Sequence, residues 1–201
     1  LKPEGSILGA IIAETRRRGY QGRVSVGHVT KLSALAPEAC AAAFAELAEN
    51  GIALTVLPAT DLYLNGREFT HLVPRGVTPG HRLIAAGGIA TLSTNNVLNP
   101  FTPFGDASLM RIANLYANIA QLGTADELQT VYDMISGKAE RLLGYAPSQI
   151  AAGAPATIVL FDAETPAEAV ATIAPALCGW CNGRKTFERP RPRLFCTPEG
   201  R

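Results

Sequence analysis

Charge of one sign and long apolar runs are scarce in this chain, and each absence excludes a class of protein. The 201 residues carry a formal net charge of +1, whereas a nucleic-acid or anionic-membrane partner would require clustered Lys and Arg. No apolar run approaches the roughly 20 residues that cross a bilayer, and no charged start followed by an apolar core marks a signal peptide. We therefore expect a cytoplasmic protein with no nucleic-acid and no membrane partner.

Cysteine is also rare, since four residues are too few for a disulfide scaffold. Cys178 and Cys181 have the spacing of a redox dithiol, but such dithiols lie at the start of a helix that follows a strand. Here Asn182 and Gly183 come next, which is a hairpin-turn signal, so the pair is expected on a strand entering a hairpin. No second Cys or His pair stands at ligand spacing, which disfavours zinc.

Hydrophobic residues make up 47% of the chain, enough for one sizeable core, and they alternate between helix and strand patterns. We expect helices over residues 6–18, 37–50, 78–86, 106–121, 124–134 and 138–143, and strands over residues 23–27, 52–56 and 89–92. Thr78 and Asp106 are candidate helix caps, and residues 58–79 are expected to form a long loop, a candidate for function. The alternation predicts an α/β fold whose parallel sheet is open or part of a (β/α)8 barrel, with a small β appendage from about Ser148.

Residues 92–105, LSTNNVLNPFTPFG, are the most informative stretch because polar groups follow the end of an apolar strand there. Ligand sites of α/β proteins lie at the carboxyl ends of strands. However, Asn95, Asn96 and Asn99 also suit an ordinary turn, because Asn tolerates left-handed backbone conformations. Local composition favours the turn, and a functional site is the alternative.

Several short motifs follow one another along the chain: GH at 27–28, LYLNGR at 62–67, PRGVT at 74–78, NNV at 95–97 and NPFTPFG at 99–105. Their order resembles that of bacterial cytosine deaminase and its neighbours in the amidohydrolase superfamily. Residues 150–160, IAAGAPATIVL, resemble the return of the chain to the small β domain of this family. The resemblance implies the C-terminal part of a (β/α)8 TIM-type barrel, about strands 6 to 8, at residues 1–147. A portion of the small β domain is expected at residues 148–201.

The resemblance also implies a divalent metal, zinc or iron, held by a His-x-His pair, by groups from middle strands and by an Asp after the eighth strand. The chain has only His28, His71 and His81, and no His-x-His, so metal binding by this chain alone is not expected. By resemblance His28 matches the sixth-strand His beside the metal. Asn95 falls on the Asp that binds the metal and moves a proton, although an amide cannot act as a base near neutral pH. We expect His81 to be exposed.

Other residues near this region have two interpretations each. Asn96 falls where the family has a group close to the substrate, and its paired donor and acceptor can read a heterocyclic ring. Arg67 with Glu68 could clamp an anionic or heterocyclic ligand, although a surface pair is simpler. His71 falls in a loop whose family counterpart shapes the pocket mouth, and a solvated histidine fits equally well. Asp61 could substitute as a base, but nothing in the sequence places it within reach.

Two function classes follow from these observations. In the first, the chain is an N-terminally incomplete portion of a deaminase-like hydrolase, inactive alone, that acts on C–N bonds other than peptide bonds in a heterocyclic amine or cyclic amide. In the second, it is a non-catalytic pseudo-enzyme or partner subunit that binds a small heterocycle or another chain. Half a barrel exposes strand edges, which invite pairing. A complementing N-terminal half or a homo-oligomer is therefore the expected protein partner.

Overall fold

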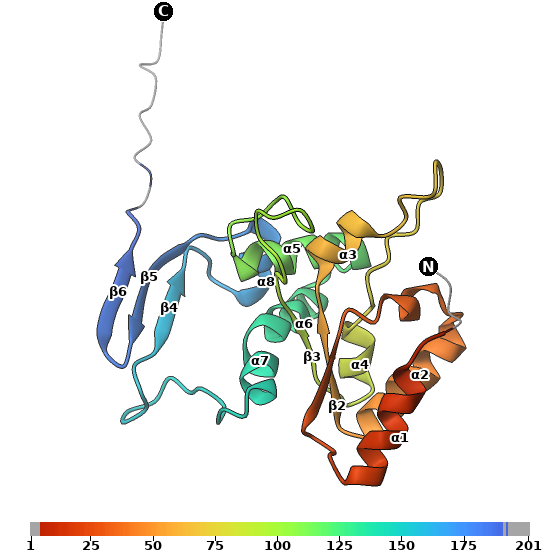
Figure 1. Cartoon of the computed structure of the whole chain (residues 1–201). Helices are drawn as coiled ribbons and strands as arrows, with labels where there is room; N and C mark the ends of the chain where they lie inside the picture. The colour runs from red at the N-terminus through yellow and green to blue at the C-terminus, as the bar shows by residue number, and fades with distance from the viewer. Residues whose placement is uncertain (1–4, 191, 193–201) are drawn as a thin grey trace, which may run out of the picture.

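Two β-sheets organise residues 5–190 and 192, the part of the chain that the computed structural model describes (Figure 1). Strands β1 (Val24–Gly27), β2 (Ile52–Val56) and β3 (Ala90–Leu92) form a parallel sheet in the order β1-β2-β3. Strands β4 (Ile158–Phe161), β5 (Ala176–Cys181) and β6 (Arg184–Glu188) form an antiparallel sheet. The α/β class is therefore confirmed.

Helices connect and cover these strands. They are α1 (Leu8–Arg18), the 3-10 helix η1 (Thr30–Ala34), α2 (Pro37–Glu49), α3 (Pro58–Leu64), α4 (His81–Ala85), α5 (Leu109–Ala120), α6 (Ala125–Ile135), α7 (Gly137–Leu142) and α8 (Pro166–Thr172). As the sequence predicts, α1 ends at Gly19, whose φ of 64° suits a residue without a side chain. Within the described residues, no helix combines the length and the apolar character needed to cross a membrane.

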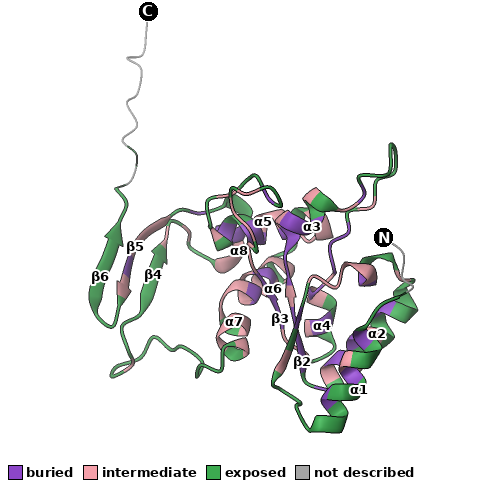
Figure 2. Cartoon of the chain, viewed as in Figure 1, coloured by how far each residue is buried: buried purple, intermediate pink, exposed green. Residues whose placement is uncertain are grey.

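The main core surrounds β2, the central strand of the parallel sheet. Ile52, Leu54 and Val56 share one face of the strand and are each at most 1% exposed, while Ala53 on the other face is 6% exposed. Both faces are therefore covered, as in other parallel sheets. Purple, buried positions in Figure 2 concentrate on β2 and β3 and on parts of the surrounding helices, whereas β4 and β6 are mostly green. The α8 helix also joins this core, because Val170 is buried and its carbonyl accepts a hydrogen bond from Asn114 Nδ2 at 2.9 Å.

The expectations for the segment after β2 and for the start of α5 are wrong. Residues 58–79 are not one long loop, because α3 occupies Pro58–Leu64 with its proline in the first turn, where a missing N–H costs nothing. Asp106 does not cap the following helix. The side chain of Ser108 accepts the Arg111 N–H there, while Asp106 accepts the backbone N–H of Ser108 at 3.0 Å.

The predicted hairpin is confirmed. Asn182 and Gly183 have φ angles of 49° and 76° and join β5 to β6. Cys178 and Cys181 lie on β5 as free thiols. A redox thiol is activated at the start of a helix, whereas both of these cysteines lie on a strand. This position does not suit a redox dithiol.

Candidate functional site

The carboxyl ends of β1, β2 and β3 lie at the same edge of the parallel sheet, below α3 and the segment that follows β3 (Figure 1). Directly after β1 the chain turns sharply, since His28 and Val29 have φ angles of 64° and 48°. The Thr78 hydroxyl donates to two backbone carbonyl oxygens, that of His28 at 2.7 Å and that of Val29 at 3.0 Å. Thr78 therefore holds this turn instead of capping α4, which begins only at His81.

A buried carboxylate holds the His28 imidazole. His28 Nδ1 lies 2.6 Å from Oδ1 of Asp61, which sits in the first turn of α3. Asp61 is 3% exposed, whereas the His28 side chain is 41% exposed. An ionised carboxylate only accepts hydrogen bonds, so an ionised Asp61 requires the hydrogen of this contact to be on His28 Nδ1. Sequence reasoning left Asp61 unplaced because it missed α3, the helix that carries this carboxylate back to the end of β1.

Asn95 faces the other nitrogen of the same ring. Its Nδ2 lies 3.4 Å from His28 Nε2, a long distance for a hydrogen bond. Its φ of 59° is the left-handed conformation expected of a turn residue. Asn95 is thus a turn residue whose amide also lies beside His28, and its exposure leaves this edge of the imidazole open to solvent.

The Asp61 carboxyl is in an unfavourable environment. Burial raises its pKa, although the His28 imidazole and the Leu57 backbone counteract part of this effect. Asp61 Oδ2 is buried and has no hydrogen-bond partner among the residues that the structure describes. A buried, unsatisfied oxygen costs free energy, so this carboxylate is not explained by folding stability.

A cavity lies next to the Asn95 turn. Its volume is about 420 Å³, and Thr94 and Asn96, the neighbours of Asn95, contribute to its lining. Most of the wall is apolar and includes Tyr63 and Phe104, whose rings meet edge to face with centroids 5.5 Å apart. Asn96 Oδ1 accepts a hydrogen bond from Asn99 at 2.8 Å, which orients its amide.

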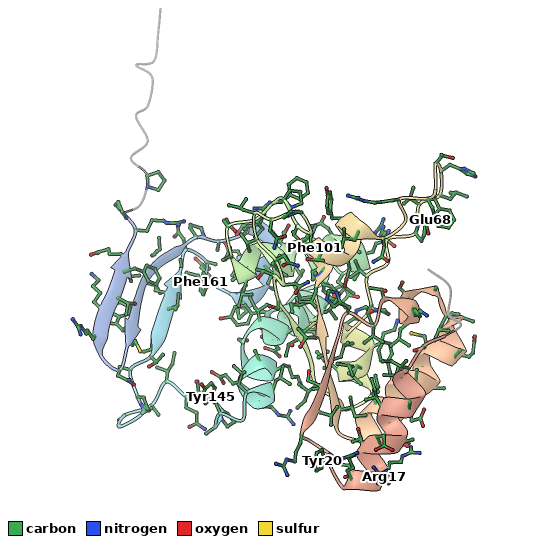
Figure 3. The ribbon with its side chains drawn as sticks, in the orientation of Figure 1. Arg17, Tyr20, Glu68, Phe101, Tyr145 and Phe161 are labelled. Atoms are coloured by element: carbon green, nitrogen blue, oxygen red, sulfur yellow. The ribbon has the colours of Figure 1, made fainter. Side chains whose placement is uncertain are left out.

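The other predicted site residues are not gathered at this cluster. The Arg67 guanidinium lies 4.5 Å from the centroid of the Tyr63 ring, and its Nε donates to the Tyr63 carbonyl at 3.2 Å. His71 is exposed on the protruding loop that carries Glu68 in Figure 3. A substrate-binding role for Arg67 and His71 stays a prediction. The expected exposure of His81 is wrong, because this residue is half-buried and its Nδ1 lies 2.8 Å from a tyrosine hydroxyl.

The donor set does not fit a divalent metal by itself. Across residues 5–190 and 192, no three His, Cys, Asp or Glu side chains lie close enough together to hold a metal ion. His28 Nε2 and the Asn95 side chain lie together at this edge of the sheet, with Asn95 Nδ2 3.4 Å from the imidazole nitrogen. A catalytic zinc requires about three protein ligands, so this pair would be incomplete.

Comparison with known proteins connects this geometry to a family, although no family model matches the chain. Over 159 residues, 78% of its length, the chain is 32% identical to the pterin deaminase of Rhizobium rhizogenes and covers 36% of that protein. Its structure superposes on 5-methylcytosine deaminase from Klebsiella pneumoniae, liganded with 5-fluorocytosine, with a TM-score of 0.89 and 26% identity. This superposition covers 97% of the chain and 48% of the deaminase. The resemblance to the amidohydrolase superfamily is confirmed.

Two further superfamily structures are similar. N-isopropylammelide isopropylaminohydrolase from Burkholderia multivorans superposes with a TM-score of 0.75 and 26% identity over 89% of this chain and 42% of its own. A zinc complex of an atrazine chlorohydrolase variant from Arthrobacter aurescens shares the fold, with a TM-score of 0.57 and 20% identity over 88% of this chain and 38% of its own. The chain thus spans between about one third and one half of the relatives it matches. Structures of this superfamily include zinc-bound hydrolases.

Proposed function

We propose that this chain forms part of the active site of a deaminase-like amidohydrolase that hydrolyses a C–N bond of an amino-substituted heterocycle. The observation that carries the proposal is the cluster of His28, Asp61 and Asn95 at the carboxyl edge of three parallel strands. The named activities of the pterin and 5-methylcytosine deaminases support the reaction class. Superposition over 97% of the chain supports β1, β2 and β3 as about strands 6 to 8 of a (β/α)8 barrel, with residues from about 148 onward in the small β domain.

The chemistry that this chain can contribute depends on His28. With Nδ1–H donated to Asp61, His28 Nε2 presents a lone pair that can accept a hydrogen bond or a proton from the attacking water. The neutral amide of Asn95 has no such capacity, but it can donate to a ring nitrogen or accept from an amino group. His28 is therefore the proton-accepting group of the cluster, and Asn95 is a binding group.

The substrate class follows from the neighbouring cavity. About 420 Å³ lies within the usual range for small-ligand pockets, and mostly apolar walls with few polar groups suit a flat heterocycle. Asn96 would bind the ring edge through its amide hydrogens, since its oxygen already accepts a hydrogen bond from Asn99. Arg67 and His71 are proposed to act at the mouth of the site only.

Ligand binding and ammonia release test this proposal separately. We would titrate the chain with pterin, cytosine and 5-methylcytosine, and measure ammonia with and without added zinc or iron. At least one heterocycle is expected to bind, and His28→Gln is expected to weaken binding roughly tenfold, the loss of about one good hydrogen bond. Arg18→Gln, a change at the solvent-exposed end of α1, is the control and should leave binding unchanged. Binding without ammonia under every condition would favour the non-catalytic alternative, and absence of any binding would refute the proposal.

A further inference from the structure

Asp61 is the one described residue whose buried side-chain oxygen lacks any hydrogen-bond partner. Its other oxygen contacts His28 Nδ1 at 2.6 Å. The carboxylate lies on α3 and the imidazole directly after β1, so two separate strand connections must be in place for this contact. The arrangement joins a 3% exposed acid to a histidine whose side chain is 41% exposed.

This contact is a poor stabiliser of the fold. Burial disfavours the ionised carboxylate of Asp61. The hydrogen bond to the partly exposed His28 offsets only a small part of this unfavourable free energy. A stabilising role would instead be expected to pair both oxygens, as buried polar groups usually do. The sequence therefore retains a group that the fold alone does not favour, which is typical of functional sites.

The contact determines which ring nitrogen of His28 carries the hydrogen. An imidazole that donates from Nδ1 leaves Nε2 as an acceptor, whereas the opposite tautomer would turn a hydrogen toward Asn95. Asn95 points its Nδ2 group toward His28 Nε2 at 3.4 Å, and an amide N–H is a donor. The Asn95 N–H group can therefore donate to His28 Nε2 only when His28 carries its hydrogen on Nδ1.

We propose that Asp61 is a positioning residue, which holds His28 in the tautomer whose Nε2 carries no hydrogen and can therefore act as an acceptor in the site. Only the identity of the ligand rests on the function proposed above. The tautomer itself is a property of the chain without ligand. The two proposals can thus fail independently.

Nuclear magnetic resonance of the chain labelled with 15N-histidine tests the proposal directly. Long-range proton–nitrogen correlations report which ring nitrogen carries the hydrogen, and a His28→Gln spectrum identifies the His28 signals among the three histidines. We expect the Nδ1–H tautomer in the unmodified chain. Asp61→Leu, which removes both acceptor oxygens, should convert His28 to a mixture or to the Nε2–H tautomer.

Asp61→Asn provides the conservative comparison. Its amide oxygen can still accept from Nδ1, and its NH₂ group replaces the unpartnered oxygen, so the original tautomer should be retained. The urea midpoint of Asp61→Asn should be unchanged or raised. Asp126→Asn, at an exposed position in the first turn of α6, is the matched control and should leave the His28 signals unmoved.

The results divide clearly. An Nε2–H tautomer in the unmodified chain would overturn the proposal, and so would an Nδ1–H tautomer that is fully retained in Asp61→Leu. Where ammonia release is detected, Asp61→Leu should lower kcat roughly 10- to 100-fold, as loss of an orienting partner of an active-site histidine does, with a smaller change in KM. No ammonia release from any variant, together with the expected tautomers, would refute the proposed function and leave this inference intact.

Discussion

The Tyr116 hydroxyl offers the sharpest test of how the site is supported. Tyr116 is fully buried on α5, and burial raises the pKa of its hydroxyl, which therefore stays protonated. The hydroxyl oxygen accepts the backbone N–H of His81 at 3.1 Å, and the hydroxyl also forms a hydrogen bond with His81 Nδ1 at 2.8 Å. Both contacts fix the start of α4, three residues after the Thr78 that holds the His28 turn.

Tyr116→Phe keeps the ring packing and removes both hydrogen bonds. A buried polar group that loses its partner costs about 1–3 kcal/mol, and the half-buried His81 favours the lower end for each of the two groups. We therefore expect a loss of about 2 kcal/mol in the free energy of unfolding. For a chain of 201 residues this corresponds to a decrease in Tm of roughly 4–8 °C.

Thermal and urea unfolding followed by circular dichroism measure this loss. Tyr145→Phe is the control, because this side chain is 66% exposed (labelled in Figure 3) and its hydroxyl makes no hydrogen bond within the described residues. Equal stability of the two phenylalanine variants would refute the reasoning, since the buried hydroxyl would then contribute nothing to holding α4.

Three further changes test other parts of the structure. Gly76→Ala should lower the free energy of unfolding by about 2 kcal/mol or more in a urea titration, because its φ is 67° and a Cβ would lie 2.5 Å from that of Asn65. Gly153→Ala is the control, with a φ of 84° and no atom near the added Cβ. It should cost only the backbone strain of about 1 kcal/mol. Burial lowers the pKa of His81, so the unfolded chain binds a proton at this residue more readily than the folded chain does. The stability that is present above about pH 6.5 should therefore fall on acidification. Urea midpoints measured from about pH 7.5 to about pH 5 should show a smaller fall in His81→Gln. Thr124→Ala should lower the free energy of unfolding by about 1 kcal/mol, because its hydroxyl accepts the Glu127 N–H in a capping box, and an unchanged urea midpoint would contradict that role.

The elements with strong local signals could be predicted from the sequence, and those set by distant contacts could not. Ile52–Val56 was predicted to the residue because its apolar run lies between an Asn-Gly turn and a proline. The sequence does not predict α3, because seven residues are too few for a clear apolar periodicity. Thr78 was misassigned for a related reason, since a threonine before a proline suits a helix start, while its actual acceptors lie 50 and 49 residues earlier.

The candidate site shows the same division. His28 and Asn95 were identified through a resemblance of motifs, and the structure brings them together. Asp61 could not be placed, because its contact with His28 depends on the turn after β1 and on α3 simultaneously. Sequence reasoning can recognise a histidine at a strand end, but the partner of its second nitrogen is a matter of three-dimensional packing.

The spacing of the site residues along the chain has a consequence for folding kinetics. Asp61 lies 33 residues after His28, and Asn95 lies 67 residues after it. Such contacts are non-local, and parallel strand pairing forms slowly because chain closure precedes any gain from the contacts. Helices such as α1 and α2 can form early, so far-UV signals would recover before the cluster exists. A ligand or spectroscopic probe at His28 would therefore report the final closure of the sheet during refolding, at a stage when overall helix content no longer changes.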